Sequence, residues 1–258
     1  MDAVSDIARA VFVHAHPDDE SLWTGGLIAA HLMRGGDADL ITATWAPGTS
    51  RHRELLDAAR ELGLPRAPIS LGYADSMVPE SAPEAPSILD VPFDEQVGVL
   101  VEHLRRLRPE IVITYDAFGM YGHPDHIHVN RLVCAAADAA PLVHYRPDTG
   151  DPWQVKSLYF ATIPVSVVNL LRPYLPDERH LPVIGTPDDD VDVRIELQDQ
   201  VGAKIRAIVC HQTEMKRSAS MRSFSSLPAE PQRRFLGSES YLRRDLVKGG
   251  AELAPPPR

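Results

Sequence analysis

The chain has 258 residues, 44% of them hydrophobic, which is enough to bury one large α/β core. Its formal net charge is -10, with 26 Lys and Arg against 36 Asp and Glu, and this disfavours a nucleic-acid or anionic-membrane surface. Cys134 and Cys210 form no CxxC pair or disulfide framework, and no signal-peptide pattern or membrane-length apolar run is present. We therefore expect a cytoplasmic protein that acts on a small molecule, with no nucleic-acid or membrane partner.

Strands alternate with helices through the first 140 residues. Apolar runs predict buried strands at 11–13, 39–44, 69–71 and 111–114, and helical spacing predicts helices at 22–32, 51–62, 93–107 and 125–139. Strands that alternate with helices are typical of a parallel sheet covered on both faces. The sequence therefore predicts a Rossmann-like, open, mostly parallel α/β sheet.

The pattern weakens in the second half of the chain. Strands are predicted at 157–161 and 191–197, helices at 165–171 and 197–210, and long loops at 75–92 and 173–190, with mixed signals after residue 217. No internal repeat and no linker divides the chain. We expect a single domain over 1–250, followed by a frayed tail at 251–258.

A first polar cluster, His16-Pro17-Asp18-Asp19-Glu20, directly follows the first strand. Pro17 disfavours a helical conformation at His16 and suits the first turn of a helix that begins there. His16 and Asp19 are three residues apart across this turn, so both can face one point. In open α/β sheets, this end of a strand is the usual place for a ligand.

A second cluster, His123-Pro124-Asp125-His126, follows the strand at 111–114 and also opens a helix. Parallel strands would bring the two clusters to the same end of the sheet. Two histidines and one carboxylate around an open position are typical of a catalytic zinc site, and the same ligands can hold ferrous iron. Each cluster alone also fits an ordinary helix start, with Pro and acidic residues in the first turn, but their paired occurrence favours a site.

These motifs resemble the LmbE-like, or PIG-L, family of zinc-dependent deacetylases. The similarity is densest at 15–20 and 121–126, and the surroundings of Thr114-Tyr115-Asp116 and Gly119 resemble the branch that acts on mycothiol precursors and conjugates. It covers most of residues 10–245. Weaker matches follow at Asp192-Val193, Lys204, His211-Gln212-Thr213-Glu214, Gly237-Ser238-Glu239 and Tyr241, with Glu214 where Gln is usual.

The resemblance implies a ligand set of His16, Asp19 and His126 for Zn²⁺. It also implies that Asp18 is the general base on the zinc-bound water. Amide hydrolysis independently asks for such a set, because zinc lowers the pKa of a bound water to about 7 and a nearby base can then take its proton.

Further roles follow from the same resemblance. Tyr121 would donate a hydrogen bond to the oxyanion, and His123 would be the protonated partner that stabilises the oxyanion or helps the amine to leave. Asp125 would support one of the histidines. For Asp18 the alternative is a capping carboxylate, and for Tyr121 it is a packed loop aromatic.

Arg51 and Asp75 are weaker candidates for binding the substrate. They match the family's substrate-binding region, and each equally fits a solvated surface charge. Beside the flat rings of Trp45, Tyr73 and Tyr121, their charges would suit a sugar, which has an apolar face and hydroxyl edges. His211, at a helix end, is either a residue behind the site or a cap.

We therefore expect a zinc-dependent N-deacetylase that acts on an N-acetylglucosaminyl-type conjugate. An amidase that cleaves a larger amide, as in mycothiol conjugates, is the nearest alternative. A ferrous-iron oxygenase is disfavoured because its usual scaffold is a β-barrel. A non-catalytic nucleotide-binding module is disfavoured because no Gly-x-Gly-x-x-Gly or Walker-type loop follows the first strand. The sequence does not indicate the oligomeric state.

Overall fold

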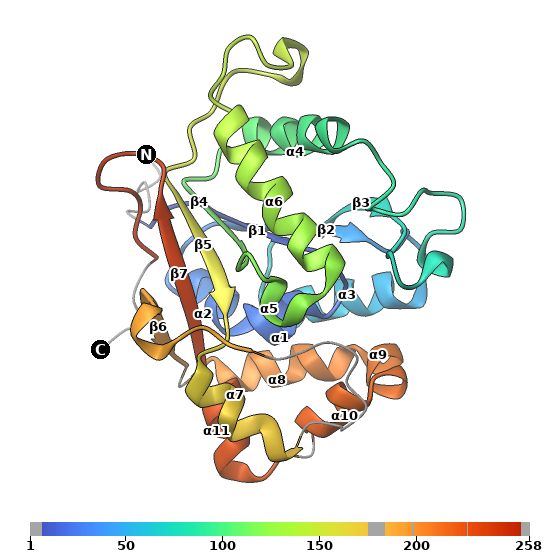
Figure 1. The fold of residues 1–258 in the computed structure, drawn as a ribbon, viewed down its shortest axis with the longest axis vertical. Helices are drawn as coiled ribbons and strands as arrows, with labels where there is room; N and C mark the ends of the chain where they lie inside the picture. The colour runs from blue at the N-terminus through green and yellow to red at the C-terminus, as the bar shows by residue number, and fades with distance from the viewer. Residues whose placement is uncertain (1–6, 175–183, 198, 226, 254–258) are drawn as a thin grey trace.

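The computed structural model describes residues 7–174, 184–197, 199–225 and 227–253, and these form one seven-stranded sheet in the order β3-β2-β1-β4-β5-β7-β6 (Figure 1). Strands β1 to β5 pair in parallel, whereas β7 is antiparallel to both of its neighbours. This confirms the predicted open, mostly parallel α/β sheet. The strands are β1 (Ala10–His14), β2 (Ala38–Thr44), β3 (Ile69–Tyr73), β4 (Ile111–Tyr115), β5 (Ser157–Thr162), β6 (Val193–Glu196) and β7 (Ser238–Asp245).

Helices cover both faces of the sheet. On one face α4 and α6 pack against each other, and on the other α8 contacts α2 and α3 (Figure 1). The helices are α1 (Asp19–Trp23), α2 (Gly25–Met33), α3 (Ser50–Glu61), α4 (Phe93–Leu107), α5 (Gly119–Gly122), α6 (Pro124–Ala139), α7 (Val165–Leu171), α8 (Val201–Cys210), α9 (Gln212–Arg217), α10 (Ala219–Ser225) and α11 (Ala229–Leu236). Short 3-10 turns lie at Pro79–Ser81, Pro147–Thr149, Arg172–Tyr174 and Asp188–Asp190.

The central strands β1 and β4 flank the point where the strand order reverses. The chain winds outward from β1 through β2 to β3, and then crosses back to β4 on the other side of β1. Both strands are buried along their whole length, which is why they read as continuous apolar runs. The loops that follow two such strands diverge and leave a crevice between them, and this crevice is the usual ligand position in open α/β sheets.

Two predictions from local patterns need correction. The helix predicted at 22–32 is broken at Thr24 (φ -135°), whose hydroxyl donates to the Glu20 carbonyl. Strand β7 was not predicted, because buried Glu239 and Ser240 remove the apolar alternation from its sequence.

Of the predicted tail, residues 251–253 are described and Ala251 is buried, with its carbonyl accepting a hydrogen bond from Tyr159 at 2.9 Å. Residues 254–258 lie outside the described part of the chain.

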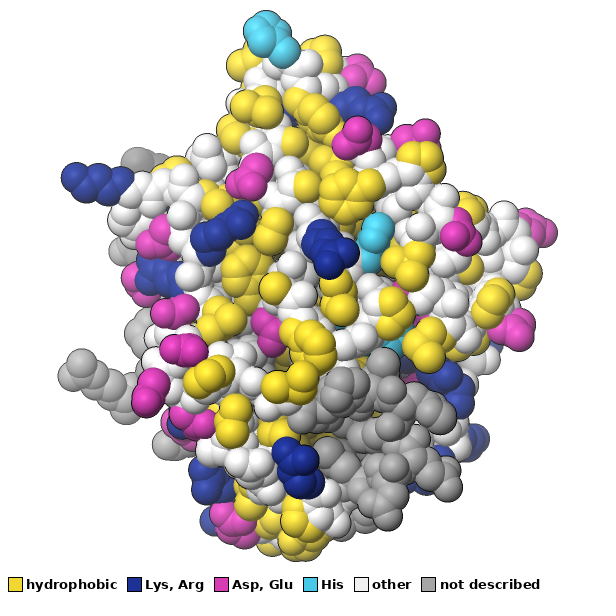
Figure 2. All heavy atoms as spheres, in the orientation of Figure 1, with side chains coloured by type: hydrophobic (Ala, Val, Ile, Leu, Met, Phe, Trp, Pro, Cys, Tyr) yellow, Lys and Arg dark blue, Asp and Glu magenta, His cyan; other side chains and the backbone are white. Residues whose placement is uncertain are grey.

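The surface agrees with the acidic composition. On the face drawn in Figure 2, Lys and Arg side chains stand singly among acidic and apolar ones, and the coloured, described residues form no continuous basic surface there. None of the described helices has the length and apolar character to cross a membrane.

A buried carboxylate of β7, that of Glu239, joins both α8 and α2 to the sheet. Lys204 Nζ lies 2.7 Å from Glu239 Oε1, and both side chains are almost fully buried. The same carboxylate accepts the backbone N–H groups of Gly26 and Leu27 at 2.8 and 2.9 Å. Glu239 therefore caps the first turn of α2 from about 210 residues away in the sequence, as a negative charge at a helix N-terminus should.

Lys204→Met should lower the free energy of unfolding by about 3–5 kcal/mol, because it leaves a buried carboxylate without its cation. Urea denaturation of the variant and the parent checks this. The control is Lys156→Met, which breaks a pair with Glu110 whose side chains are 45% and 33% exposed. That loss should stay below about 1 kcal/mol. Equal losses in the two variants would contradict the role given to Lys204.

Candidate active site

The loop after β1 makes an unusual turn at Asp18. Its φ of 128° and ψ of -26° lie in a region that non-glycine residues rarely adopt, at a cost of about 1–3 kcal/mol. The backbone N–H of Asp18 donates to Glu20 Oε2 at 3.0 Å, and that of His16 donates to Asp19 Oδ2 at 2.9 Å. The turn sends the side chains of Asp18 and Asp19 in different directions, so neighbours in sequence have different surroundings.

The second cluster arrives on the first turn of α6 and is fixed by the loop before it. The ring of His126 stacks on Tyr115, with centroids 4.0 Å apart and planes 4° from parallel. Its Nδ1 lies 3.2 Å from the carbonyl of Gly119. Gly119 has a φ of 66°, and a Cβ there would come within 2.7 Å of the His126 Cβ. Glycine is therefore required for this close approach.

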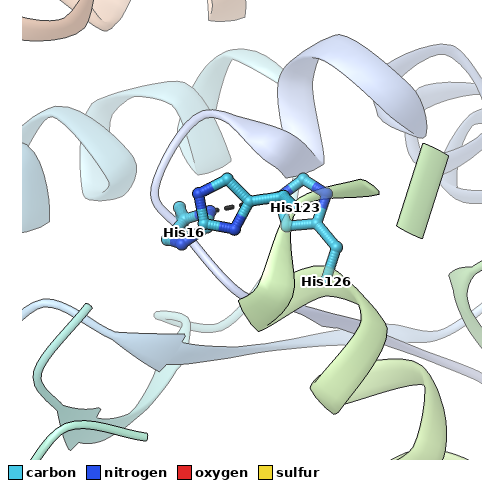
Figure 3. A group of neighbouring side chains, drawn as sticks. All are labelled: His16, His123 and His126. Carbon is cyan, nitrogen blue, oxygen red and sulfur yellow. Dashed lines mark hydrogen bonds between the residues drawn. The ribbon is translucent and has the colours of Figure 1, made fainter. Parts of the chain in front are cut away.

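The Gly119 carbonyl also determines the tautomer of His126. A carbonyl can only accept, so Nδ1 carries the proton and Nε2 of the neutral ring presents a lone pair. That Nε2 lies 3.1 Å from His16 Nδ1 and 3.3 Å from Asp19 Oδ1. The rings of His16, His123 and His126 converge from the loop after β1 and the start of α6 (Figure 3).

His16 has its opposite nitrogen among carboxylates. Its Nε2 lies 3.1 Å from Asp125 Oδ2 and 3.4 Å from Asp75 Oδ2. Burial disfavours the charged form of Asp125, but hydrogen bonds from His16 and Ser76 outweigh it and lower the pKa of Asp125 to about 2. An ionised Asp125 accepts the Nε2 proton of His16, so the lone pair of the neutral ring is at Nδ1.

Asp19 completes this arrangement as a tightly held carboxylate. Its Oδ2 accepts from the Tyr115 hydroxyl at 2.6 Å, and its Oδ1 accepts from Trp23 Nε1 at 3.0 Å. Burial would raise the pKa of Asp19, but the neighbouring His126 and His16 outweigh this effect and hold the pKa well below its ordinary range. Burial likewise opposes the charge of His16, yet the carboxylates of Asp125 and Asp19 hold its pKa well above the ordinary value. Without a metal the His16 ring therefore carries protons on both nitrogens, and a bound cation would displace the proton on Nδ1.

The donor set fits a divalent cation. Once the Nδ1 proton of His16 is displaced, lone pairs on His16 Nδ1 and His126 Nε2 meet beside an ionised carboxylate, and a cation stabilises this assembly. Two further groups have ligand atoms within 4.8 Å of one another, namely His16, His123 and His126, and His16, Asp75 and Asp125. In the last group the Oδ1 of Asp125 is buried without a hydrogen-bond partner. His16 is common to every set.

Asp18 lies beside this cluster and is paired with Arg51. The Nη2 of Arg51 is 3.0 Å from Asp18 Oδ1 and also donates to the carbonyl of Pro17. Burial raises the pKa of Asp18 to about 7 against the opposing charge of Arg51, with further contributions from Asp19 and Glu214. The side chain of Asp18 is 15% exposed, more than those of Asp19, Asp75 and Asp125 at 5%, 4% and 0%.

The alternative that Arg51 and Asp75 are solvated surface charges is wrong, because both side chains are buried. Arg51 is 2% exposed, with its guanidinium 4.5 Å from the Trp45 ring centroid. Asp75 is 3% exposed and faces His16, while its Oδ1 accepts the Met77 N–H. Protein groups pair with both charges: Asp18 and Glu214 with Arg51 in the first turn of α3, and His16 with Asp75 in the loop after β3.

His123 and Tyr121 lie at the more open side of the cluster. His123 Nδ1 accepts the backbone N–H of Asp125 at 3.2 Å, so its proton is on Nε2. Burial, together with His16 and His126, lowers the pKa of His123 to about 3. The Tyr121 ring is half-buried, with centroids 5.2 Å from His126 and 6.1 Å from Trp23.

A small hollow that is partly open to solvent adjoins the site. Trp23, which donates to Asp19, and Met120, which precedes Tyr121, form the wall shared with the cluster. The hollow is lined by both apolar and hydrogen-bonding side chains. The remaining lining residues are Leu22, Thr162, Ile163, Pro164, Val167, Lys204, Arg234, Phe235, Ser238, Glu239 and Ser240.

Sequence reasoning assigned no role in the site to several residues that shape it. Trp23 and the hydroxyl of Tyr115 hold Asp19, and Glu20 is paired with His211 at 2.8 Å. The apolar positions of Trp23 and Tyr115 resemble ordinary core, so only their polar atoms reveal the role. His211 stands at the junction of α8 and α9, where its side chain makes no capping hydrogen bond and faces Glu20 instead.

Several known proteins are similar to this chain in sequence or in fold. Residues 11–137 match the model of the PIG-L family, described as GlcNAc-PI de-N-acetylase. A 1D-myo-inositol 2-acetamido-2-deoxy-alpha-D-glucopyranoside deacetylase of Rhodococcus jostii (strain RHA1) is 34% identical over 277 residues, covering 94% of this chain and 92% of the relative. The protein of the same name in Rhodococcus opacus (strain B4) is 36% identical over 239 residues, covering 80% and 82%.

Solved structures share the fold at low identity. The N,N'-diacetylchitobiose deacetylase of Pyrococcus horikoshii superposes with a TM-score of 0.63 at 17% identity, covering 93% of this chain and 85% of that one. GalB, the 4-carboxy-2-hydroxymuconate hydratase of Pseudomonas putida KT2440, gives 0.60 at 16% identity, covering 92% and 96%. Because this fold carries more than one reaction, the assignment depends on the sequence relatives. On the strength of those relatives, this chain belongs to the PIG-L family of de-N-acetylases.

Proposed function

We propose that this protein is a zinc-dependent hydrolase that removes the acetyl group from an N-acetylglucosaminyl conjugate. The observation that carries the proposal is the convergence of His16 Nδ1, His126 Nε2 and the Asp19 carboxylate where β1 and β4 end. The relatives named as deacetylases of a glucosaminyl inositol support the substrate class.

In the proposed site, His16, Asp19 and His126 hold the metal. Bound there, zinc supplies a water whose pKa is near 7 and polarises the acyl oxygen of the substrate. Hydrogen bonds to the outer atoms of the ligands fix their orientation: Asp125 accepts from His16, Gly119 accepts from His126, and Tyr115 donates to Asp19. Such outer partners raise the basicity of the ligands and hold the tautomers needed for coordination.

Asp18 is the proposed general base. Its carboxylate is the most exposed among those of Asp18, Asp19, Asp75 and Asp125, and it lies against Arg51 outside the converging donors. It can therefore reach a water molecule while Asp19 remains tied to Tyr115 and Trp23. The attacking water gives its proton to Asp18, which can return it to the departing amine.

His123 and Tyr121 are proposed to donate hydrogen bonds to the oxyanion. The protonated state expected for His123 does not fit its surroundings, because burial beside His16 and His126 holds its pKa at about 3. A neutral ring with its proton on Nε2 still donates to a developing negative charge. We therefore propose neutral His123 in place of a protonated partner.

The hollow next to Trp23 and Met120 is the proposed place for the second group of the conjugate. It offers the flat faces of Trp23 and Phe235 beside the Ser240 hydroxyl and the guanidinium of Arg234. That mixture suits a polyol or sugar, which has both apolar faces and hydroxyl edges. We propose the hollow for this role in place of Arg51 and Asp75, because the charges of these two residues are paired within the protein.

The metal ligands are tested by elemental analysis of protein purified without chelators. We expect one zinc per chain in the parent, and loss of metal in His16→Ala and His126→Ala, because each removes a converging lone pair. The control, His144→Ala, changes an exposed histidine outside the cluster and should keep the metal. Full occupancy in both ligand variants would show that the assignment is wrong.

Asp18→Asn should retain the metal but lower kcat by about 10²–10⁴-fold, because it removes the base and keeps the shape. Asp19→Asn should weaken metal binding instead. Measurement of metal content and acetate release on both variants separates the roles. The reverse result, with metal lost from Asp18→Asn alone, would exchange the two assignments.

The substrate is tested with zinc-loaded protein by measuring acetate release from an N-acetylglucosaminyl-inositol and from free N-acetylglucosamine. The conjugate should give the higher kcat/KM, because its second group contributes binding energy. Arg234→Ala should reduce this advantage, while Arg233→Ala, an exposed neighbour that does not line the hollow, should not. Failure to release acetate from any amino-sugar conjugate would reject the proposed function.

A further inference from the structure

The strained turn at Asp18 is tied down on both sides. Its backbone N–H donates to Glu20 Oε2, and the preceding carbonyl, that of Pro17, accepts from the Arg51 guanidinium. The same guanidinium holds Asp18 Oδ1 at 3.0 Å. Glu20 and Arg51 thus act as two tethers on one residue. Without them, a non-glycine residue with a φ of 128° would relax to a common conformation.

Each tether is held in turn by the chain segment where α8 meets α9. His211 Nε2 lies 2.8 Å from Glu20 Oε1, and Glu214 Oε2 lies 3.0 Å from Arg51 Nη1. His211 and Glu214 are three residues apart and both are buried. One short segment therefore reaches both tethers of a residue that lies almost 200 positions earlier in the sequence.

We propose that His211 and Glu214 are positioning residues for Asp18, acting through Glu20 and Arg51. The proposal rests on the proposed function, which makes Asp18 the general base. It assigns the segment 211–214 a part in catalysis without contact with substrate or metal. It also makes Arg51 a support for the base, not a residue that recognises the second group of the conjugate.

The geometry around Arg51 explains why Glu214 matters. The guanidinium carbon of Arg51 lies 4.5 Å from the centroid of the Trp45 ring. Its two terminal nitrogens bind different partners, Nη2 binding Asp18 and Nη1 binding Glu214. A planar fork held at both tips cannot rotate. When the Glu214 carboxylate is removed, one tip loses its acceptor in a buried place, and the fork is free to turn and carry Asp18 with it.

The test compares Glu214→Ala with a matched control, Glu61→Ala. The control also breaks a Glu–Arg pair between α3 and the C-terminal helices, that of Glu61 with Arg206 at 2.7 Å, but it is exposed and far from the turn. In Glu214→Ala, kcat for acetate release should fall roughly 10- to 100-fold with KM and metal content unchanged, because a misplaced base slows the reaction without weakening binding. Glu61→Ala should keep both constants.

A conservative variant separates orientation from charge. Glu214→Gln keeps an oxygen that accepts from Arg51 Nη1, so it should restore most of the kcat lost in Glu214→Ala. If Glu214→Ala does not fold, Arg51→Lys takes its place, because an ammonium keeps the charge but not the fork. A raised KM at constant kcat in either variant would mean that Arg51 and Glu214 contribute to substrate binding, and would overturn the proposal.

Amide hydrogen exchange provides a readout that needs no activity. The backbone N–H groups of His16 and of residues 18–20 should exchange faster in Glu214→Ala than in the parent, and Glu61→Ala should match the parent. If the protein releases no acetate from any conjugate, the proposed function fails, and this exchange experiment still decides whether the segment holds the turn. Equal exchange in Glu214→Ala and the parent would overturn the proposal.

Discussion

The imidazole of His16 lies between two groups of acceptors, and the rest of the site depends on which of its two nitrogens keeps a proton when a metal binds. The carboxylate of Asp125 accepts a hydrogen bond from Nε2, which keeps its proton. Nδ1 is then the nitrogen that offers a lone pair towards His126 and Asp19 when a metal binds. The Gly119 carbonyl does the same for His126. One side-chain acceptor and one backbone acceptor therefore orient the two histidines so that a lone pair of each points towards the same place.

The sheet brings these groups together because β1 and β4 are neighbours although about 100 residues separate them. Each strand ends in a loop that opens a helix, and the loops diverge at the point where the strand order reverses. A rigid, fully buried pair of strands fixes the distance between the clusters. Elements late in the chain then add supports, with Glu239 of β7 beneath α2 and Glu214 of α9 beneath Arg51.

Local patterns predicted the central strands, their helices and the two clusters, because each follows from periodicity or from a motif within a few residues. They could not predict β7, because its buried Glu239 is paired with Lys204 and the first turn of α2, far away in the sequence. They also left a solvated Arg51 open, because nothing near it in sequence shows that Glu214 will pair with it in the interior. Charge in the sequence suggests exposure, and only the tertiary partner reverses that inference.

The most direct test of the account is a crystal structure of zinc-loaded protein, with anomalous scattering used to locate the metal. We expect zinc bonded to His16 Nδ1, His126 Nε2 and Asp19, at about 2.0–2.2 Å. Zinc on the opposite side of the same ring, bonded to His16 Nε2 between Asp75 and Asp125, would contradict the placement of the His16 proton from which the account begins.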